Sequence, residues 1–204
     1  MYLDFKTLTP NQCYGAMTQT IVPRPIAWVL SDSGNNNFNV APFSFFTGIC
    51  SDPPLIMLSV GKKDANEEKD TRVNIRERSH FVVHIPNTRH LDQVNTTSAS
   101  LEHGDSEIDS ANLELDDIQG FALPRIVNCD IAIACELYRI DEIGSVPQAV
   151  IYGKIHSITI NDDLVLPHPK GHFQVDSKAL DPLSRLGGSN YVGLGDVLVA
   201  KWPK

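Results

Sequence analysis

The sequence lacks any long apolar run and any excess of basic residues, and each absence narrows the class of protein. No stretch approaches the roughly 18 apolar residues of a membrane-spanning helix, and the first twenty residues carry no basic-then-apolar targeting pattern. Lys and Arg total 17 against 25 Asp and Glu, for a net charge of −8, which disfavours a nucleic-acid partner. We therefore expect a cytoplasmic protein in which two or three local cations can still hold a small anion.

Several chemical motifs are also absent. The four cysteines form no Cys-x-x-Cys pair, and Cys129 and Cys135 are too far apart in an extended chain to bond to each other. We expect all four to be buried, reduced thiols. His168 and His172 are four residues apart, but Pro169 and Gly171 argue against the helix that would align them on a metal. The sequence contains neither Gly-x-Ser-x-Gly nor Gly-x-Gly-x-x-Gly after a strand. A metal site, a serine hydrolase and a Rossmann nucleotide domain are therefore disfavoured.

What is present is an ordinary globular composition with many strand-like segments. With 204 residues, 42% hydrophobic and 21% charged, the chain fits a single domain over 1–204. Many short strands without strand–helix–strand alternation favour an all-β barrel or an α+β fold. The patterns predict strands at 21–31, 38–46, 55–60, 80–85, 126–140 and 149–160, and helices at 10–19, 71–78 and 88–97, with Thr9 and Asp70 as N-caps of the first two helices.

The segment Asn39-Val40-Ala41-Pro42-Phe43-Ser44 is the most informative. Pro42 has no N–H to donate, so this segment cannot be a regular central strand. Its backbone N–H groups and Ser44 are left to face something other than a neighbouring strand. Beside the aromatic rings of Phe43, Phe45 and Phe46, such an edge suits a flat aromatic ligand with a polar rim. The alternative for each phenylalanine is plain core packing.

Lys69-Asp70-Thr71 precedes the predicted helix at 71–78 and forms a candidate anion site. A helix N-terminus offers unpaired N–H groups and the positive end of the helix dipole. Thr71 adds a hydroxyl group and Lys69 a full charge, which together suit a phosphate monoester. Asn74, one turn later, faces the same side. The alternative is an N-capped surface helix that follows a solvated run of charges.

Two further motifs are candidates. Arg24 stands between Pro23 and Pro25, which fix the backbone and aim the guanidinium at a phosphate or ring carbonyl; the alternative is a solvated arginine at a strand start. In 185–191, paired glycines that include Gly188 permit a tight turn and close backbone approach. Tyr191 can then cover a ring or hydrogen-bond to its edge, the alternative being a turn with a packed tyrosine.

The order of these motifs resembles one known family. Pro-Arg-Pro-Ile-Ala from residue 23, Asn-x-Ala-Pro-Phe-Ser-x-Phe from 39, Asp-Pro-Pro from 52 and Lys-Asp-Thr from 69 follow one another as in the flavin reductase-like family of FMN-binding split barrels. The resemblance extends over roughly residues 8 to 195. It implies a mainly β fold, a split β-barrel with flanking helices, that binds FMN noncovalently.

The resemblance also implies roles for particular residues. Lys69 and Thr71 would hold the FMN phosphate, with Ser44 near the phosphate or ribityl chain. The flavin ring would lie against backbone N–H groups, which can stabilise the negative charge that develops on reduction. The complete set of implied cofactor-binding residues is Arg24, Asn39, Ala41, Pro42, Phe43, Ser44, Ser59, Val60, Gly61, Lys69, Thr71, Asn74, Gly188 and Tyr191.

The activity implied by the resemblance is hydride transfer from NADH or NADPH to FMN, with electrons passed on to a free flavin or another acceptor. The alternative is a non-enzymatic electron carrier similar to flavoredoxin, which exchanges electrons with a protein partner. Family members are typically homodimers, so 185–191 could contact the flavin of the other subunit. Leu30 and His84 depart from residues common in the family, and we expect the change at His84 to alter the floor of the site.

Overall fold

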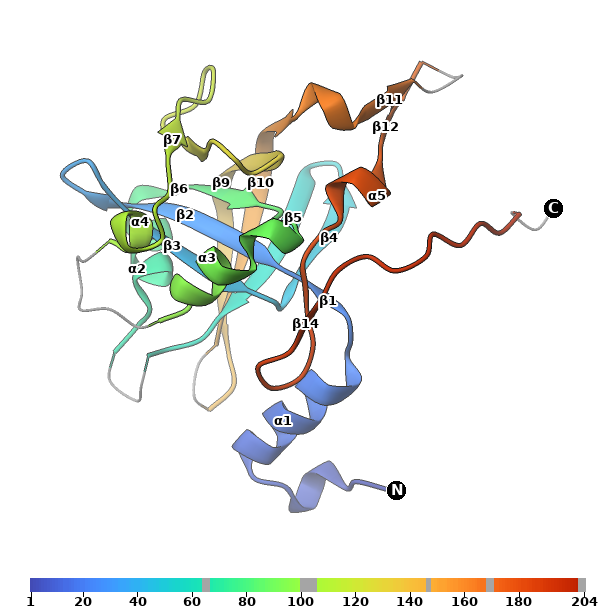
Figure 1. Cartoon of the computed structure of the whole chain (residues 1–204). Helices are drawn as coiled ribbons and strands as arrows, with labels where there is room; N and C mark the ends of the chain where they lie inside the picture. The colour runs from blue at the N-terminus through green and yellow to red at the C-terminus, as the bar shows by residue number, and fades with distance from the viewer. Residues whose placement is uncertain (64–66, 100–105, 146–147, 168–170, 202–204) are drawn as a thin grey trace.

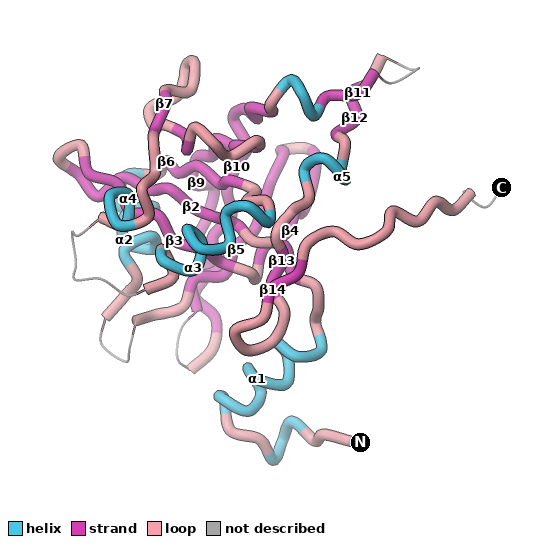
Figure 2. Tube along the Cα trace, in the orientation of Figure 1, coloured by secondary structure: helices cyan, strands magenta, loops and turns pink. Residues whose placement is uncertain are grey.

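Seven antiparallel strands form the main sheet of the protein. The structure is a computed structural model, and it describes residues 1–63, 67–99, 106–145, 148–167 and 171–201. In Figure 2 the strands gather in the centre and the helices lie around them. The order is β3-β2-β6-β9-β10-β5-β4, with bounds β2 (Ala27–Gly34), β3 (Asn37–Phe43), β4 (Phe46–Ser51), β5 (Pro54–Val60), β6 (His80–His84), β9 (Ile131–Ile143) and β10 (Gln148–Ile160).

The longest pair, β9 and β10, is the backbone of the sheet, as the alternating apolar pattern predicts. β10 pairs on its other side with β5, and its register shifts between Tyr152 and Gly153. A Cβ atom at Gly153 would lie 2.4 Å from Cζ of Phe81, so only glycine allows the two segments to approach this closely. This bend helps the sheet to curl.

β3 is an edge strand, which confirms that the segment around Pro42 is not a central one. It pairs only with β2 in the sheet order, with Pro42 opposite Trp28. The chain then breaks at Ser44 and Phe45, where the Phe45 carbonyl accepts a 2.9 Å hydrogen bond from the Ser59 N–H. Because β3 ends at Phe43 and β4 begins only at Phe46, the end of β3 and the two residues that follow it form a short wall, 42–45, at the mouth of the curled sheet.

Apolar side chains pack on both faces of the sheet. Successive residues of β2 alternate, so Trp28 and Leu30 belong to one cluster and Ala27 and Val29 to the other. The second cluster joins Phe43 of β3 to residues of β5, which requires the sheet to curl until its two ends face each other. The first cluster packs beneath α3, α4 and residues 111–126.

The remaining elements flank this barrel (Figure 1). α1 projects from the lower end, and the C-terminal segment runs away from the body. The helices are η1 (Phe5–Thr7), α1 (Pro10–Thr20), α2 (Asp70–Arg78), η2 (Thr88–His90), α3 (Leu91–Thr96), α4 (Glu107–Ser110), η3 (Asp162–Leu164) and α5 (Ser177–Leu180). The short strands are β1 (Arg24–Pro25), β13 (Ser184–Arg185) and β14 (Tyr191–Val192) in one sheet, β7 (Leu115–Asp116) with β8 (Arg125–Ile126), and β11 (Val165–Pro167) with β12 (Phe173–Val175).

The predicted start of α1 is confirmed. Thr9 is the N-cap, its hydroxyl accepts from the Gln12 N–H at 3.3 Å, and Gln12 accepts in return from the Thr9 N–H at 2.9 Å. This is a capping box with proline in the first helical position. The helix at 88–97, in contrast, begins with the 3₁₀ turn η2 before α3 continues it.

The segment at 126–140 differs from the prediction. It is not one strand, because β8 ends at Ile126 and β9 begins only at Ile131. Cys129 therefore lies outside the strand that contains Cys135. Both thiols are buried and free, and burial raises the pKa of each. Cys50 is exposed and Cys13 only partly buried, so the expectation of four buried thiols was also wrong.

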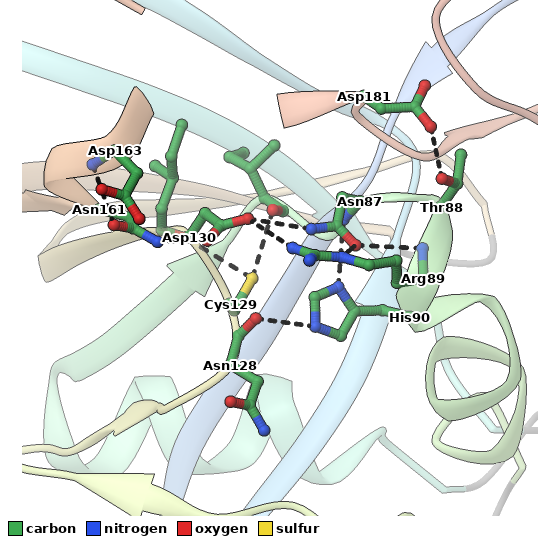
Figure 3. A network of polar contacts seen from close by, with 12 residues as sticks. Asn87, Thr88, Arg89, His90, Asn128, Cys129, Asp130, Asn161, Asp163 and Asp181 are labelled. Carbon is green, nitrogen blue, oxygen red and sulfur yellow. Dashed lines mark hydrogen bonds and ion pairs between the residues drawn. The ribbon is translucent and has the colours of Figure 1, made fainter. Parts of the chain in front are cut away.

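A polar network fastens the ends of three strands of the sheet (Figure 3). The Asp130 carboxylate, just before β9, accepts from the Asn87 amide at 3.0 Å and from the Asn161 amide at 2.9 Å. Arg89 adds an ion pair to the same carboxylate at 3.1 Å. Asn87 follows β6 and Asn161 follows β10, so the carboxylate satisfies groups that the ends of these strands bring together.

Candidate functional site

A cavity with a volume of about 730 Å³ lies at the mouth of the barrel. Its walls come from segments far apart in the sequence: α1, residues 42–45, the loop after β5, α3 and the turn 185–191. Such a volume accommodates a ligand of the size of a nucleotide cofactor. The lining residues are Pro10, Cys13, Tyr14, Met17, Ile26, Pro42, Phe43, Ser44, Phe45, Ser59, Gly61, Lys62, Lys69, Asn95, Ser98, Gln148, Arg185, Ser189 and Tyr191.

The charge of this cavity is opposite to that of the chain. Lys62, Lys69 and Arg185 line it, and no aspartate or glutamate does so among the described residues. The chain as a whole has a net charge of −8. A cleft lined by positive charges attracts negatively charged molecules. The cavity is therefore suited to an anionic ligand.

A recess of about 30 Å³ opens beside the cavity at the start of α2 and shares Lys69 with it. Asn39, Ala41 and Thr71 line this recess, so three further predicted residues are brought to the same place. The Asn39 amide donates to the Thr71 hydroxyl at 2.9 Å, which orients the hydroxyl. A small tetrahedral anion would find a lysine, a hydroxyl and a helix N-terminus here.

The helix at this recess begins differently from the prediction. Lys69 is the N-cap residue and Asp70 the first helical residue, and no side chain caps the helix. The prediction of Asp70 as N-cap was therefore wrong. Asp70 instead forms an ion pair with Lys63 at 3.1 Å. The N-terminal N–H groups of α2 are left without a side-chain cap, beside the lysine that lines both cavity and recess.

Two carboxylates, those of Asp70 and Glu107, also line the recess. Glu107 of α4 is 4% exposed, and one of its carboxylate oxygens accepts from the Val40 N–H at 3.0 Å. Burial raises the pKa of this carboxyl above its ordinary value, and the hydrogen bond from Val40 offsets part of that increase. Glu107 thereby covers the edge strand β3 and adds negative charge at one side of the recess.

Arg24 lies behind the cavity wall and does not line it. The guanidinium is 4% exposed and donates to the Thr18 and Ile21 carbonyls at 2.7 Å each and to the Leu186 carbonyl at 2.9 Å. Its Nε–H donates to Ser44 Oγ at 3.3 Å. The structure thus shows Arg24 joining α1, the wall at 42–45 and the turn after β13. Its contact with a ligand stays a prediction.

Three other predicted residues lie outside the cavity lining. Asn74 turns toward β2 and donates to the hydroxyls of Ser31 and Ser33 at 3.1 Å each. Val60 is fully buried in the core. Gly188 has a φ of 64°, which glycine adopts without strain, and forms the turn beside the lining residue Ser189. Seven predicted residues do line the cavity, namely Pro42, Phe43, Ser44, Ser59, Gly61, Lys69 and Tyr191.

His84 is not at the floor of the site, contrary to the prediction. The ring is completely buried between strands: Nδ1–H donates to the Trp28 carbonyl at 3.1 Å, and Nε2 accepts from the Ile126 N–H at 2.9 Å. Burial lowers the pKa of the imidazole to about 4, so the ring is neutral at pH 7. Its role is to join β2 and β8 to β6.

Sequence reasoning missed the contribution of α1. Tyr14 lies near Phe45, with ring centroids 6.1 Å apart, and Cys13 and Met17 line the cavity beside it. In the structure α1 buries only Thr18, so its apolar residues do not serve the protein's own core, and the sequence alone did not show this. Gln148 and Asn95 gave no signal, because only the curl of the sheet brings them here.

Comparisons with known proteins agree with this geometry. A protein with a split barrel domain from Shewanella frigidimarina NCIMB 400 superimposes with a TM-score of 0.83 at 18% identity, covering 100% of this chain and 99% of that one. Nitrilotriacetate monooxygenase component B from Bacillus cereus is 31% identical, covers 98% of each chain and has a TM-score of 0.89. The 2-nitrobenzoate 2-nitroreductase NbaA from Pseudomonas fluorescens is 28% identical, with a TM-score of 0.88, and the match covers 100% of this chain and 96% of that one.

The fold is therefore a split β-barrel, as the resemblance implied. The model of the flavin reductase like domain matches residues 18–175, and the chain belongs to this family. Membership supports a flavin-related oxidoreductase function. Over the described ranges, no helix is long and apolar enough to cross a membrane, and no group of three or more His, Cys, Asp or Glu side chains is placed to hold a metal ion.

Proposed function

We propose that this protein is an FMN-binding oxidoreductase that takes electrons from NADH or NADPH. The observation that supports the proposal is one cavity of about 730 Å³ that combines aromatic walls with a cationic end at a helix N-terminus. A flat ring system joined to a phosphate monoester requires both features. Neither a metal site nor a nucleophile with an adjacent base is needed for this chemistry.

The residues present fit FMN. Lys69 and Thr71 would bind the phosphate at the recess, where the N–H groups of α2 lack a side-chain cap. Residues 42–44 and Gly61 would lie along the ring, since proline and glycine leave the backbone accessible there. Asn39 would orient the Thr71 hydroxyl through its 2.9 Å hydrogen bond.

When bound, FMN would supply an acceptor for a hydride from the nicotinamide and pass the electrons to a second molecule. The chain itself contributes binding, orientation and exclusion of water. Tyr14, Phe45 and Tyr191 narrow the cavity around its ligand, and Arg24 fixes the wall that carries Ser44. No residue is assigned as general acid or base, because positioning and electrostatics suffice for hydride transfer.

The test is the absorption spectrum of the purified protein, followed by titration with FMN if it is colourless. We expect two flavin bands or saturable binding, and anaerobic addition of NADH or NADPH should then bleach them. A protein that binds FMN but is not bleached would instead be an electron carrier similar to flavoredoxin. Absence of FMN binding would overturn the cofactor assignment and would not affect the assignment of the split-barrel fold.

We also propose that the protein is a homodimer, as is typical of its family. Apolar side chains are exposed at both ends of the chain, with Tyr2 at 88% and Leu198 at 90% exposure. Burying such residues against a second copy would remove them from water. Light scattering after size-exclusion chromatography should give twice the mass of one chain, and a monomer at micromolar concentration would contradict the proposal.

A further inference from the structure

Arg185 differs from most arginines of this chain in having no carboxylate beside it. Six of the eight arginines form ion pairs with aspartate or glutamate: Arg72, Arg76, Arg78, Arg89, Arg125 and Arg139. Arg24 is bound by backbone carbonyls instead. Arg185 alone lines the cavity, and within the described part of the chain no acidic side chain pairs with it.

The guanidinium of Arg185 is held in one place. Its Cζ lies 4.3 Å from the centroid of the Tyr191 ring, and one N–H donates to the Gly188 carbonyl at 2.6 Å. The backbone of Arg185 pairs with Arg24 on one side and with Tyr191 on the other. An arginine stacked on an aromatic ring keeps further N–H donors in its plane, which suits bidentate recognition of an anionic oxygen pair.

This cation is separate from the one at the phosphate recess. Lys69 precedes α2, whereas Arg185 belongs to β13 beside β14, and Figure 1 shows α2 and β14 well apart. A single phosphate monoester at the recess therefore leaves Arg185 without an anion. The aromatic pair Tyr14 and Phe45 lines the same cavity and offers a surface for a second flat molecule.

We propose that Arg185, Tyr191, Tyr14 and Phe45 form a second subsite, which binds an aromatic molecule carrying an anionic oxygen group. The inference rests on the proposed function, because it assigns the Lys69 end to FMN. Two sources share the required chemistry: a small aromatic carboxylate that accepts electrons, and the diphosphate of the nicotinamide dinucleotide that donates them. In either case Arg185 binds the anion and the aromatic side chains contact the ring.

The experiment titrates small probes into the FMN-loaded protein and measures heats of binding. Benzoate tests for a small aromatic carboxylate, benzamide is its neutral counterpart, and ADP-ribose tests for the dinucleotide diphosphate. The variants are Arg185→Gln, Arg185→Lys and the control Arg139→Gln. Arg139 is a matched control because its Cζ lies 4.6 Å from the centroid of the Tyr152 ring, outside the cavity.

We expect Arg185→Gln to weaken binding of benzoate or ADP-ribose about tenfold or more, the size of a lost charge-assisted pair of hydrogen bonds. Arg185→Lys should recover part of the affinity, since it keeps the charge without the planar fork. Benzamide affinity and the effect of Arg139→Gln should both stay within about twofold. Loss confined to benzoate identifies the small carboxylate, and loss confined to ADP-ribose identifies the dinucleotide.

The FMN dissociation constant of each variant separates this inference from the proposed function. Unchanged FMN affinity with weakened probe binding supports the second subsite. Equal probe binding by the wild type and Arg185→Gln overturns the second subsite and leaves the assignment of FMN untouched. A loss of FMN affinity as large as the loss of probe affinity also overturns the second subsite, because Arg185 would then contact FMN itself. If the wild type does not bind FMN, the proposed function fails, and with it the assignment of Arg185 to a second site.

Discussion

Polar side chains have different partners in the interior of the protein and at the wall of the cavity. In the interior, the polar atoms of Arg24, Asn74 and His84 are bonded to other parts of the chain, and no buried side-chain nitrogen or oxygen of the described residues lacks a partner. At the cavity, neither Lys69 nor Arg185 forms an ion pair with a carboxylate of the described residues, although Glu107 lines the recess beside Lys69. Interior polar groups thus fasten segments together, whereas those of the cavity remain available to a ligand.

The largest expected effect comes from removing the buried guanidinium. Arg24→Met keeps the length of the side chain but leaves the carbonyls of Thr18, Ile21 and Leu186 without their donor. We expect a loss of about 3–5 kcal/mol in the free energy of unfolding. Urea denaturation measures this value, and Arg185→Met on the paired strand is the control, with an expected loss of about 1 kcal/mol. Equal losses of unfolding free energy in the two variants would contradict the difference between the interior and the cavity wall.

The next effect belongs to the cavity. Lys69→Ala combined with Thr71→Ala should weaken FMN binding by about 2–4 kcal/mol, the size of lost charge-assisted hydrogen bonds. Fluorescence titration with FMN measures the affinity, and Lys178→Ala in α5 serves as a control that should change nothing. Unchanged affinity in the double variant would remove both residues from the phosphate site.

A third effect appears in acid. The pKa of His84 is about 4 in the folded protein and about 6.5 when unfolded, so between these values the unfolded chain binds the extra proton. Stability is therefore lost as the pH falls from about 6.5 to about 4, by up to about 3 kcal/mol. His84→Gln should be less stable at pH 7 but flatter across this window. Urea denaturation at a series of pH values compares the slopes, and parallel slopes would contradict the assignment.

The smallest effect is expected at the recess. The raised pKa of Glu107 means that the folded protein holds the proton more tightly than the unfolded chain, so stability falls as the pH rises through that value. Glu107→Gln keeps an acceptor for the Val40 N–H and removes the buried charge. We expect a gain of about 1 kcal/mol or less at pH 7 and none at pH 4 in thermal denaturation. A large loss at pH 7 would show that the charge itself is needed.

The sequence could predict those features that depend on neighbouring residues. The capping box at Thr9, the edge position of Pro42 and the alternation in β10 all follow from local chemistry, and the structure confirms them. The roles of Arg24, Asn74 and His84 could not be predicted. Their hydrogen-bond partners lie up to 162 residues away in the sequence, and only the curl of the sheet decides whether such a side chain faces a cavity or a neighbouring strand.

The candidate site divides in the same way. Lys69, Pro42 and Ser44 stand in compact motifs and were predicted, whereas Tyr14 and Gln148 reach the cavity from segments with no motif of their own. Arg185 lies within a predicted motif, but its lack of an acidic neighbour is a property of three-dimensional placement. Which charged side chains form ion pairs could therefore not be predicted from the sequence.

The attachment of α1 has a consequence for how the protein can diversify. The helix forms one wall of the cavity while burying only one of its own residues, and the Arg24 guanidinium secures its end. Residues such as Cys13, Tyr14 and Met17 can consequently be exchanged without disturbing the barrel. Substitutions in α1 can therefore change which molecules the cavity binds while the barrel keeps its fold.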